Sequence, residues 1–220
     1  LVLFSNKGIM YRILVDNIPD GTNATKGVPI ASLIKIGNDE QIIAVSSLHR
    51  KTMPKYIIFI TQNGIVKKSF IKEYFKTNRN NGIKALNIRE GDRLVKILFQ
   101  DNEDLLLLSQ KGMSIRFKTS DIGAIGRIAT GIRGMKLNEG DKVIAAMSIH
   151  KETDYVAIFT KDGTCKKVAL NEYPIQMRNG KGTIYYRNGK IIYEGDWIND
   201  KFEGNGKSFY ENGEYYIGQW

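Results

Sequence analysis

Short apolar runs alternate with glycine-containing turns along the first 182 residues. The runs "LVLFS", "YIIFIT", "LLLLS" and "YVAIFT" each precede a two-residue turn that contains glycine, and a second strand-like run follows each turn. The turn glycines are 56, 48 and 51 residues apart, at Gly8, Gly64, Gly112 and Gly163. Strands rich in β-branched and aromatic residues around a tight glycine turn are typical of β-hairpins. The pattern therefore predicts four recurring hairpins.

A second pattern follows each of the first three hairpins. It consists of a glycine-bearing loop, a strand, an acidic turn and a final apolar strand, at 26–45, 81–98 and 131–147. About four strands in every fifty residues is typical of a propeller-like array with one blade per period. We expect an all-β fold of about 3.5 blades, that is, three full blades and the opening hairpin of a fourth.

The last part of the chain follows a different period. "YEGDW" at 193–197 returns as "YIGQW" at 216–220, which is 23 residues later. The dipeptides Asn188-Gly189 and Asn212-Gly213 are strong hairpin signals because both turn residues tolerate a positive φ. Both tryptophans also lie in this part. We predict a domain boundary that separates residues 1–182 from residues 183–220.

Charge is distributed unevenly over these two parts. The whole chain has a formal net charge of +10, whereas residues 183–220 hold four basic and six acidic residues. No run of eighteen apolar residues suggests a transmembrane helix. The single cysteine, Cys165, lies in a predicted strand, and one cysteine fits a reducing compartment. These features favour a cytoplasmic protein that does not act at a membrane.

The sequence contains no recognisable catalytic or metal-binding constellation. His49 and His150 each follow the last apolar strand of a period, so we interpret them as blade-junction residues. No Cys/His cluster has the spacing of a metal site. The run "GNGKS" lacks the earlier glycine of a phosphate-binding loop, because Lys201 occupies that position. We therefore predict no catalytic residue, no metal and no cofactor.

Basic residues recur at the same places in successive repeats, and this is the chemical signal that remains. Cations follow each hairpin turn and also occur in the interblade loops. A stripe of such charges would bind a polyanion by releasing counterions, without reading bases. Few aromatic residues lie between the cations, which favours duplex DNA over a stacked single strand. The alternative is that the charges only keep a β-rich protein soluble. The predicted contacts are Arg12, Lys26, Lys67, Lys68, Arg79, Lys84, Arg116, Lys118, Arg127, Arg133, Lys166, Lys167, Arg178 and Lys181.

These phrases resemble successive blades of the C-terminal domain of the A subunit of bacterial DNA gyrase, or of its topoisomerase IV counterpart. The resemblance covers about residues 1–182 and includes "FITQNGIVKKSFIKEYFKTNRNNGIKALNIREGD" and "LLLLSQKGMSIRFKTSDIGAIGRIATGIRGMKLNEGD". It implies a β-pinwheel whose basic rim wraps a duplex, in a type II topoisomerase that also contains an A-subunit core and a B subunit. It further implies nucleoid association, and that the basic residues named above are the wrapping contacts.

The resemblance also has limits that affect function. The family's gyrases carry a QRRGGKG-like box, and "QMRNGKG" at 176–182 is only a degenerate loop of that type. Gyrase and topoisomerase IV therefore stay as alternatives. The catalytic tyrosine domain of the family has no counterpart in these residues. The resemblance thus implies an accessory domain with no chemistry of its own.

Residues 180–220 resemble two MORN repeats, which are short β-hairpins that stack glycine and aromatic residues into a ribbon. The resemblance rests on "YEGDW", "YIGQW" and the G-x-G phrases. It implies a protein contact through the tail. One alternative function is thus a MORN-mediated scaffold with weak DNA binding, and another interpretation is an artificial or misjoined chimera.

Overall fold

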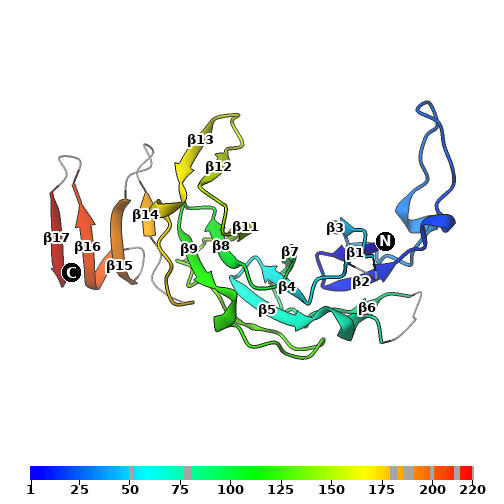
Figure 1. Cartoon of the computed structure of the whole chain (residues 1–220), viewed down its shortest axis with the longest axis horizontal. Coiled ribbons are helices and arrows are strands. Elements are labelled where there is room, and N and C mark those ends of the chain that lie inside the picture. Colours follow the sequence, from blue (N-terminus) through cyan, green and yellow to red (C-terminus); the bar gives the residue numbers. More distant parts are fainter. Residues whose placement is uncertain are drawn as a thin grey trace. The chain divides into compact units, whose positions relative to one another are not determined.

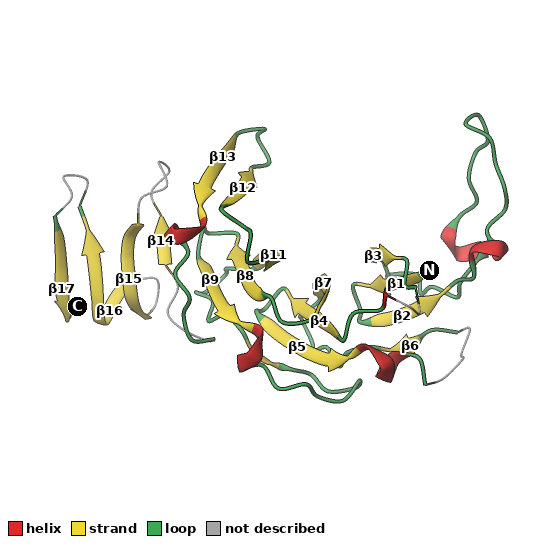
Figure 2. Ribbon diagram, in the orientation of Figure 1, coloured by secondary structure: helices red, strands yellow, loops and turns green. Residues whose placement is uncertain are grey.

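A computed structural model gives the structure of residues 1–49, 52–76, 81–178, 183–185, 191–198, 201–210 and 214–219. Strands dominate these residues, and the helices among them are short 3-10 turns (Figure 2). None of those helices is long and apolar enough to cross a membrane. The all-β prediction is confirmed. The chain divides into two compact units, which are Leu1–Gln62 with Val66–Asp101 and Gly123–Ile132, and Asn63–Ile65 with Asn102–Ile122 and Arg133–Trp220.

The first repeat forms a four-stranded antiparallel sheet with the strand order β3-β1-β2-β6 (Figure 1). β1 (Val2–Ser5) and β2 (Ile9–Arg12) form the predicted hairpin, and β3 (Ile42–Ser46) pairs with the other side of β1. The fourth strand, β6 (Ile83–Lys84), belongs to the next repeat and pairs with β2. One blade is therefore completed by a strand from its successor.

The second repeat forms a sheet with the equivalent order β10-β5-β4-β7. β4 (Tyr56–Thr61) and β5 (Ile65–Phe70) form the hairpin, and β7 (Leu94–Gln100) returns to pair with β4. The short strand β10 (Ile132–Arg133) lies at the other edge, beside β5. It occupies the position that β6 has in the first sheet.

The third repeat begins in the same way but leads into a longer sheet. β8 (Asp104–Ser109) and β9 (Ser114–Lys118) form its hairpin, and β11 (Val143–Ile149) pairs with β8. β14 (Thr183–Tyr185) then pairs with β9, with Thr183 opposite Ser114. This sheet continues through three more strands of the tail, in the order β11-β8-β9-β14-β15-β16-β17.

The tail strands form an antiparallel meander. They are β15 (Ile191–Ile198), β16 (Lys201–Phe209) and β17 (Tyr215–Gln219), and neighbours in sequence are neighbours in the sheet (Figure 1). The predicted Asn188-Gly189 and Asn212-Gly213 turns lie outside the described residues.

The fourth repeat contributes a separate two-stranded sheet. β12 (Tyr155–Phe159) pairs with β13 (Cys165–Ala169), so that Phe159 is opposite Cys165. A 3-10 turn follows this hairpin, as it follows each of the others. These turns are η1 (Val15–Asn17), η4 (Ile71–Tyr74), η5 (Thr119–Asp121) and η6 (Leu170–Glu172), and η2 (Ile30–Ser32) lies further along the first repeat.

We call β6, β10 and β14 the exchange strands, because each joins the hairpin of the preceding repeat. The residues after β6 donate two backbone hydrogen bonds to the turn glycine of that hairpin, from the amides of Ala85 and Leu86 to the carbonyl of Gly8, at 2.8 and 3.3 Å. The third repeat makes the same contact to Gly64, at 2.9 and 3.3 Å. A turn glycine is thus the point at which successive repeats are fastened together.

Exchange also builds the apolar core of the first compact unit. Val2, Phe4 and Met10 of the first hairpin pack in one buried cluster with residues of the second repeat, including Phe59 and Leu86. The rings of Phe4 and Phe59 meet edge to face with centroids 5.9 Å apart. Burial of this apolar surface between the repeats favours folding at roughly 25 cal/mol per Å².

Gly64 is required by its backbone conformation and also by its surroundings. Its φ is +78°, in the left-handed region that residues with a Cβ disfavour. A Cβ at this position would lie 2.7 Å from the carbonyl oxygen of Met135, which belongs to the segment after β10. Gly163 has a similar φ of +82°, but a Cβ there would meet nothing within 4 Å.

We predict that Gly64→Ala lowers the free energy of unfolding by more than Gly163→Ala. The Gly163 substitution carries only the conformational cost, of about 1 kcal/mol, whereas the Gly64 substitution also displaces the segment after β10. Urea unfolding of the two variants measures the difference. Equal destabilisation would contradict the role of Gly64 in fastening the repeats.

Lys67, one of the predicted DNA contacts, lies in the core. It is fully buried at 0% exposure, and its Nζ donates hydrogen bonds to the carbonyls of Ala85, at 2.6 Å, and Arg127. The amine also lies 5.0 Å from the ring centroid of Phe59 and 5.6 Å from that of Tyr74. Because the interior encloses this amine, we remove Lys67 from the cations that could face a phosphate.

Burial changes the protonation of Lys67. Desolvation, with a smaller contribution from the nearby Arg127 charge, lowers its pKa from 10.5 to about 7. Between these values the unfolded chain holds a proton that the folded protein releases. The free energy of unfolding therefore rises with pH across this range, and the stability is lost as the pH falls back toward 7.

We predict that Lys67→Met reduces this pH dependence; the smaller contribution of Lys68, whose pKa is also lowered by desolvation, remains. In the unchanged protein the free energy of unfolding is expected to rise from about pH 7 to about pH 9, with a slope of at most about 1.4 kcal/mol per pH unit. Urea unfolding across this range measures the slope. Lys7→Met, at an exposed lysine, is the matched control and should keep it. A slope as steep in Lys67→Met as in the unchanged protein would refute the assignment.

Candidate nucleic-acid interface

The most regular cation of the repeats is the fourth residue after each turn glycine. In the second repeat this cation is Lys68, which is opposite Ile58 in the strand pairing. Tyr56, two residues before Ile58 on the same strand, therefore lies diagonally across from Lys68. Diagonal neighbours of this kind lie within reach of long side chains. The four equivalent cations are Arg12, Lys68, Arg116 and Lys167.

In three repeats this diagonal neighbour engages the cation. The Nζ atoms of Lys68 and Lys167 lie 4.4 and 3.7 Å from the ring centroids of Tyr56 and Tyr155. Lys68 is buried at 5% exposure, and desolvation is the main cause that lowers its pKa. Lys167 is exposed. These contacts were not predicted from the sequence, although an aromatic or acidic residue begins the preceding strand in these three repeats.

Arg116 makes an ion pair instead. Its guanidinium donates to Asp104 Oδ2 from Nη2 at 2.8 Å and from Nε at 3.1 Å, and Nη1 donates to the carbonyl of Tyr173 at 3.4 Å. Both side chains are largely buried. The carboxylate neutralises most of the charge that this position was expected to offer. In the first repeat, half-buried Arg12 lies 5.7 Å from the ring centroid of Phe75.

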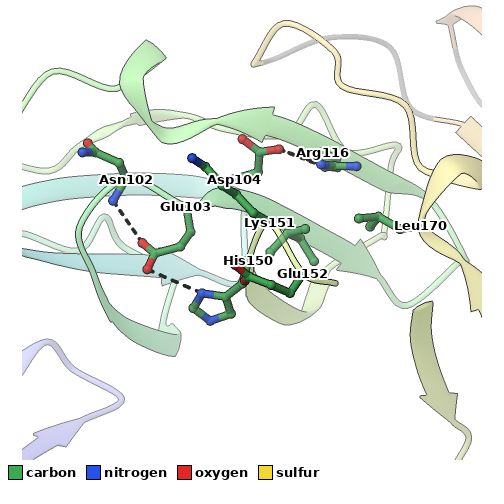
Figure 3. Close-up of a pocket in the computed structure, with 9 residues that line it drawn as sticks. Asn102, Glu103, Asp104, Arg116, His150, Lys151, Glu152 and Leu170 are labelled. Carbon is green, nitrogen blue, oxygen red and sulfur yellow. Dashed lines mark hydrogen bonds and ion pairs between the residues drawn. The ribbon is translucent and has the colours of Figure 1, made fainter. Parts of the chain in front are cut away.

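A cavity of about 400 Å³ lies beside this ion pair (Figure 3). Glu103 and His150 face each other in it, with 3.6 Å between the Glu103 carboxylate and His150 Nδ1. His150 therefore lies at the end of β11 against the start of β8, which fits its interpretation as a junction residue. Within the described residues, no group of three or more His, Cys, Asp or Glu side chains could hold a metal ion.

Two loop arginines occupy equivalent sites on the exchange strands. Arg127 Nη1 donates to the carbonyl of Lys84 in β6, and Arg178 Nη1 donates to the carbonyl of Arg133 in β10, at 3.4 Å. The side chains of Lys84, Arg133 and Arg178 are exposed, and Arg127 is half-buried. We call Lys84 with Arg127, and Arg133 with Arg178, the basic pairs.

The grouping into basic pairs was not predicted from the sequence. All four residues were predicted as contacts. Their grouping depends on the pairing of exchange strands with the preceding repeat, which brings together residues that are 43 or 45 positions apart in the sequence. One sequence signal could have indicated the grouping: Arg127 and Arg178 follow the turn glycines of their hairpins, Gly112 and Gly163, by the same number of residues. Each pair brings one cation from each of two successive repeats together at an exchange strand.

The remaining predicted contacts differ in exposure. Lys26 and Lys118 are exposed, and Lys166 is half-buried. Arg79 and Lys181 lie outside the described residues.

Comparison with known proteins agrees with this repeat structure. The chain matches the family described as "DNA gyrase C-terminal domain, beta-propeller" in four successive segments, residues 1–49, 55–101, 103–150 and 154–192. It is 34% identical over 199 residues to the A subunit of DNA gyrase from Mycobacterium tuberculosis (strain CDC 1551 / Oshkosh), and 34% identical over 201 residues to that from Staphylococcus aureus (strain NCTC 8325 / PS 47). Each alignment covers 87% of this chain but only 24% or 22% of the relative. The chain thus spans about a quarter of the length of these relatives.

Solved structures show the same fold. The crystal structure of the C-terminal domain of DNA topoisomerase IV has a TM-score of 0.77 at 26% identity, over 99% of this chain and 68% of that one. The DNA gyrase A C-terminal domain has a TM-score of 0.67 at 23% identity, over 93% of this chain and 66% of that one. Each segment that matches the family contains one hairpin and its turn glycine. With matches over most of its length, the chain belongs to the DNA gyrase C-terminal domain family, the family that its sequence resembles.

Proposed function

We propose that this domain binds duplex DNA through its phosphates and wraps it along successive repeats. The observation that carries the proposal is the recurrence of a basic pair at equivalent sites, with Lys84 of the second repeat beside Arg127 of the third, and Arg133 of the third beside Arg178 of the fourth. In each pair the arginine of the loop donates a hydrogen bond to a backbone carbonyl of an exchange strand. The positions of the exchange strands therefore determine where the positive charge recurs.

Phosphate binding is the chemistry that such pairs support. Arginine and lysine bind phosphate by charge and hydrogen bonding, and each phosphate contact releases counterions. The pairs lie on strands and loops, and contact with a duplex backbone needs no base-reading helix. Exposed Lys26, Lys118 and Lys167 would extend the contact.

The wider role follows from the family. The relatives are subunits of DNA gyrase. We propose that the domain is a non-catalytic part of a bacterial type II topoisomerase, acts with an A-subunit core and a B subunit, and supports changes of DNA topology at the nucleoid. Gyrase and topoisomerase IV remain equal candidates for that enzyme.

The tail suggests a second role. We propose that residues 183–220 form a MORN-like ribbon that contacts another protein and is a domain distinct from blades 1–182, to which its first strand, β14, is joined by pairing with β9. The last described strand, β17, exposes Tyr215, Tyr216 and Ile217 in a row. Such a row of exposed apolar residues at the end of a sheet is suited to a protein contact. Under this alternative, the tail acts as a scaffold and DNA binding is weak.

We predict that the double variant Lys84→Gln/Arg133→Gln lowers affinity for duplex DNA about tenfold at low salt. It should also reduce the slope of log affinity against log salt by about two, because two phosphate contacts are lost. Electrophoretic mobility shifts across a salt series measure both. These exposed side chains can be changed without opening the core.

The matched control is Lys7→Gln/Lys161→Gln, which removes the same charge from exposed sites beside two hairpin turns. It should change affinity and slope much less. An equal effect of the two double variants would mean that only total charge matters, and it would contradict a localised interface at the basic pairs.

A further inference from the structure

The buried amine of Lys67 contacts the backbone of both segments that form one basic pair. Its Nζ donates one hydrogen bond to the carbonyl of Arg127 itself, and another, at 2.6 Å, to the carbonyl of Ala85, the residue after Lys84. The hydroxyl of Tyr74 donates to the same carbonyl of Ala85, at 3.1 Å. One amine therefore joins the loop that contains Arg127 to the segment that contains Lys84.

The loop that contains Arg127 lies along β5. The amide of Ile125 donates to the carbonyl of Lys68 at 2.9 Å, and two residues later the carbonyl of Arg127 accepts from Lys67. The side chain of Arg127 then reaches the carbonyl of Lys84 through Nη1. The position of the guanidinium thus depends on backbone that Lys67 holds.

The second basic pair provides an internal comparison. Ile115 occupies in the third hairpin the position that Lys67 has in the second, because each is the third residue after the turn glycine. Ile115 is buried at 1% exposure, and its side chain has no donor for the loop of Arg178. Arg178 is exposed, whereas Arg127 is half-buried. The two pairs therefore differ in whether an amine holds the arginine loop.

The groups that face Lys67 determine how its proton responds to a ligand. Arg127 approaches from the loop before β10, and its charge adds to the larger effect of desolvation in lowering the pKa of Lys67 to about 7. Tyr74 faces the amine from η4, and burial raises the pKa of this phenol, which stays neutral. β4 and the segment after β6 contribute the uncharged residues Phe59 and Ala85. An outside anion can therefore act on Lys67 through Arg127.

We propose that Lys67 is a positioning residue for the phosphate site at Lys84 and Arg127, and that it takes up a proton when a duplex binds there. The inference rests on the proposed function and adds a regulation to it. A phosphate beside Arg127 offsets the repulsion between the guanidinium and the amine. The protonated amine keeps both carbonyl hydrogen bonds and is attracted to two aromatic rings, whose centroids are 5.0 and 5.6 Å away.

Proton uptake makes the affinity for DNA depend on pH. The pKa of Lys67 is about 7 in the free protein, and bound phosphate raises it in the complex. The affinity is therefore highest below pH 7 and falls as the pH rises from about 7 toward the pKa of the complex, by at most about tenfold for each pH unit. The second basic pair, with Ile115 at the equivalent position, contributes no such dependence.

Isothermal titration calorimetry of the full chain with a short duplex counts these protons, in buffers that differ in ionisation enthalpy. At about pH 8 the unchanged protein should take up about 0.3 to 1 proton more than Lys67→Met. Ile115→Met places the same side chain at the equivalent buried position of the next repeat, so it is the matched control and should keep the full uptake. Lys68, whose pKa is also lowered, is present in every variant, so its contribution cancels in the comparison.

A double-mutant cycle tests the positioning role. Lys84→Gln should weaken duplex binding about threefold in the unchanged protein and by less in Lys67→Met, because Arg127 is then no longer held beside Lys84. Arg133→Gln should cost the same in both backgrounds, since its pair does not involve Lys67. Mobility shifts at one salt concentration measure all of these affinities. A cost of Lys84→Gln that is equal in both backgrounds would contradict the positioning role.

A direct titration keeps the test open even if Lys67→Met does not fold. In NMR spectra of the unchanged protein with isotope-labelled lysine side chains, a lysine resonance should titrate near pH 7 in the free protein and at higher pH in the duplex complex. Equal titration in both states, or equal proton uptake by Lys67→Met and the unchanged protein while both bind duplex, would overturn this inference alone. Failure to bind duplex would overturn the proposed function as well.

Discussion

The structure depends on one backbone contact, in which the carbonyl of a hairpin-turn glycine accepts two amide hydrogen bonds from the following repeat. The contact is made at Gly8 and again at Gly64, and at Gly64 it leaves no room for a Cβ. A two-residue exchange strand could not stay in place through its own ladder bonds. The paired amides and the apolar residues beside them hold it there, and the same residues seal the core between the repeats. Local turn chemistry thus determines how one blade is joined to the next.

The position of each cation relative to this junction decides what it does. Lys67 points into the junction, so it is buried in the core and its pKa is lowered to about 7. Arg116 lies on the second strand of the third hairpin, and its charge is paired with that of Asp104. Lys84 and Arg133 lie on the exchange strands themselves and remain exposed. The backbone carbonyl of each accepts a hydrogen bond from a loop arginine. The repeat therefore groups positive charge at the exchange strands, which is where the proposed interface lies.

Much of the fold follows from the sequence, because glycine turns and strand alternation are local signals. The hairpins at Gly8, Gly64, Gly112 and Gly163 and the all-β class were predicted, and the structure and the comparisons confirm them. The burial of Lys67 was not predicted. Two adjacent lysines are normally surface residues, and only the segment after β6, which the sequence alone does not place, buries Lys67. The basic pairs were also not predicted, because their members are more than forty positions apart and come together only where an exchange strand joins the preceding repeat. The boundary at residue 182 and the MORN-like identity of the tail stay as predictions.

The central claim is that the repeats guide a duplex along their basic pairs, and ligation of nicked circular plasmid in the presence of the domain tests it most directly. Wrapping constrains the writhe of the bound duplex, so the topoisomers recovered after the protein is removed should shift in linking number in one direction, in proportion to the amount of domain added. The shift should shrink in Lys84→Gln/Arg133→Gln at equal occupancy. A plasmid that is bound, as judged by mobility shift, but is ligated with an unchanged linking-number distribution would contradict the claim.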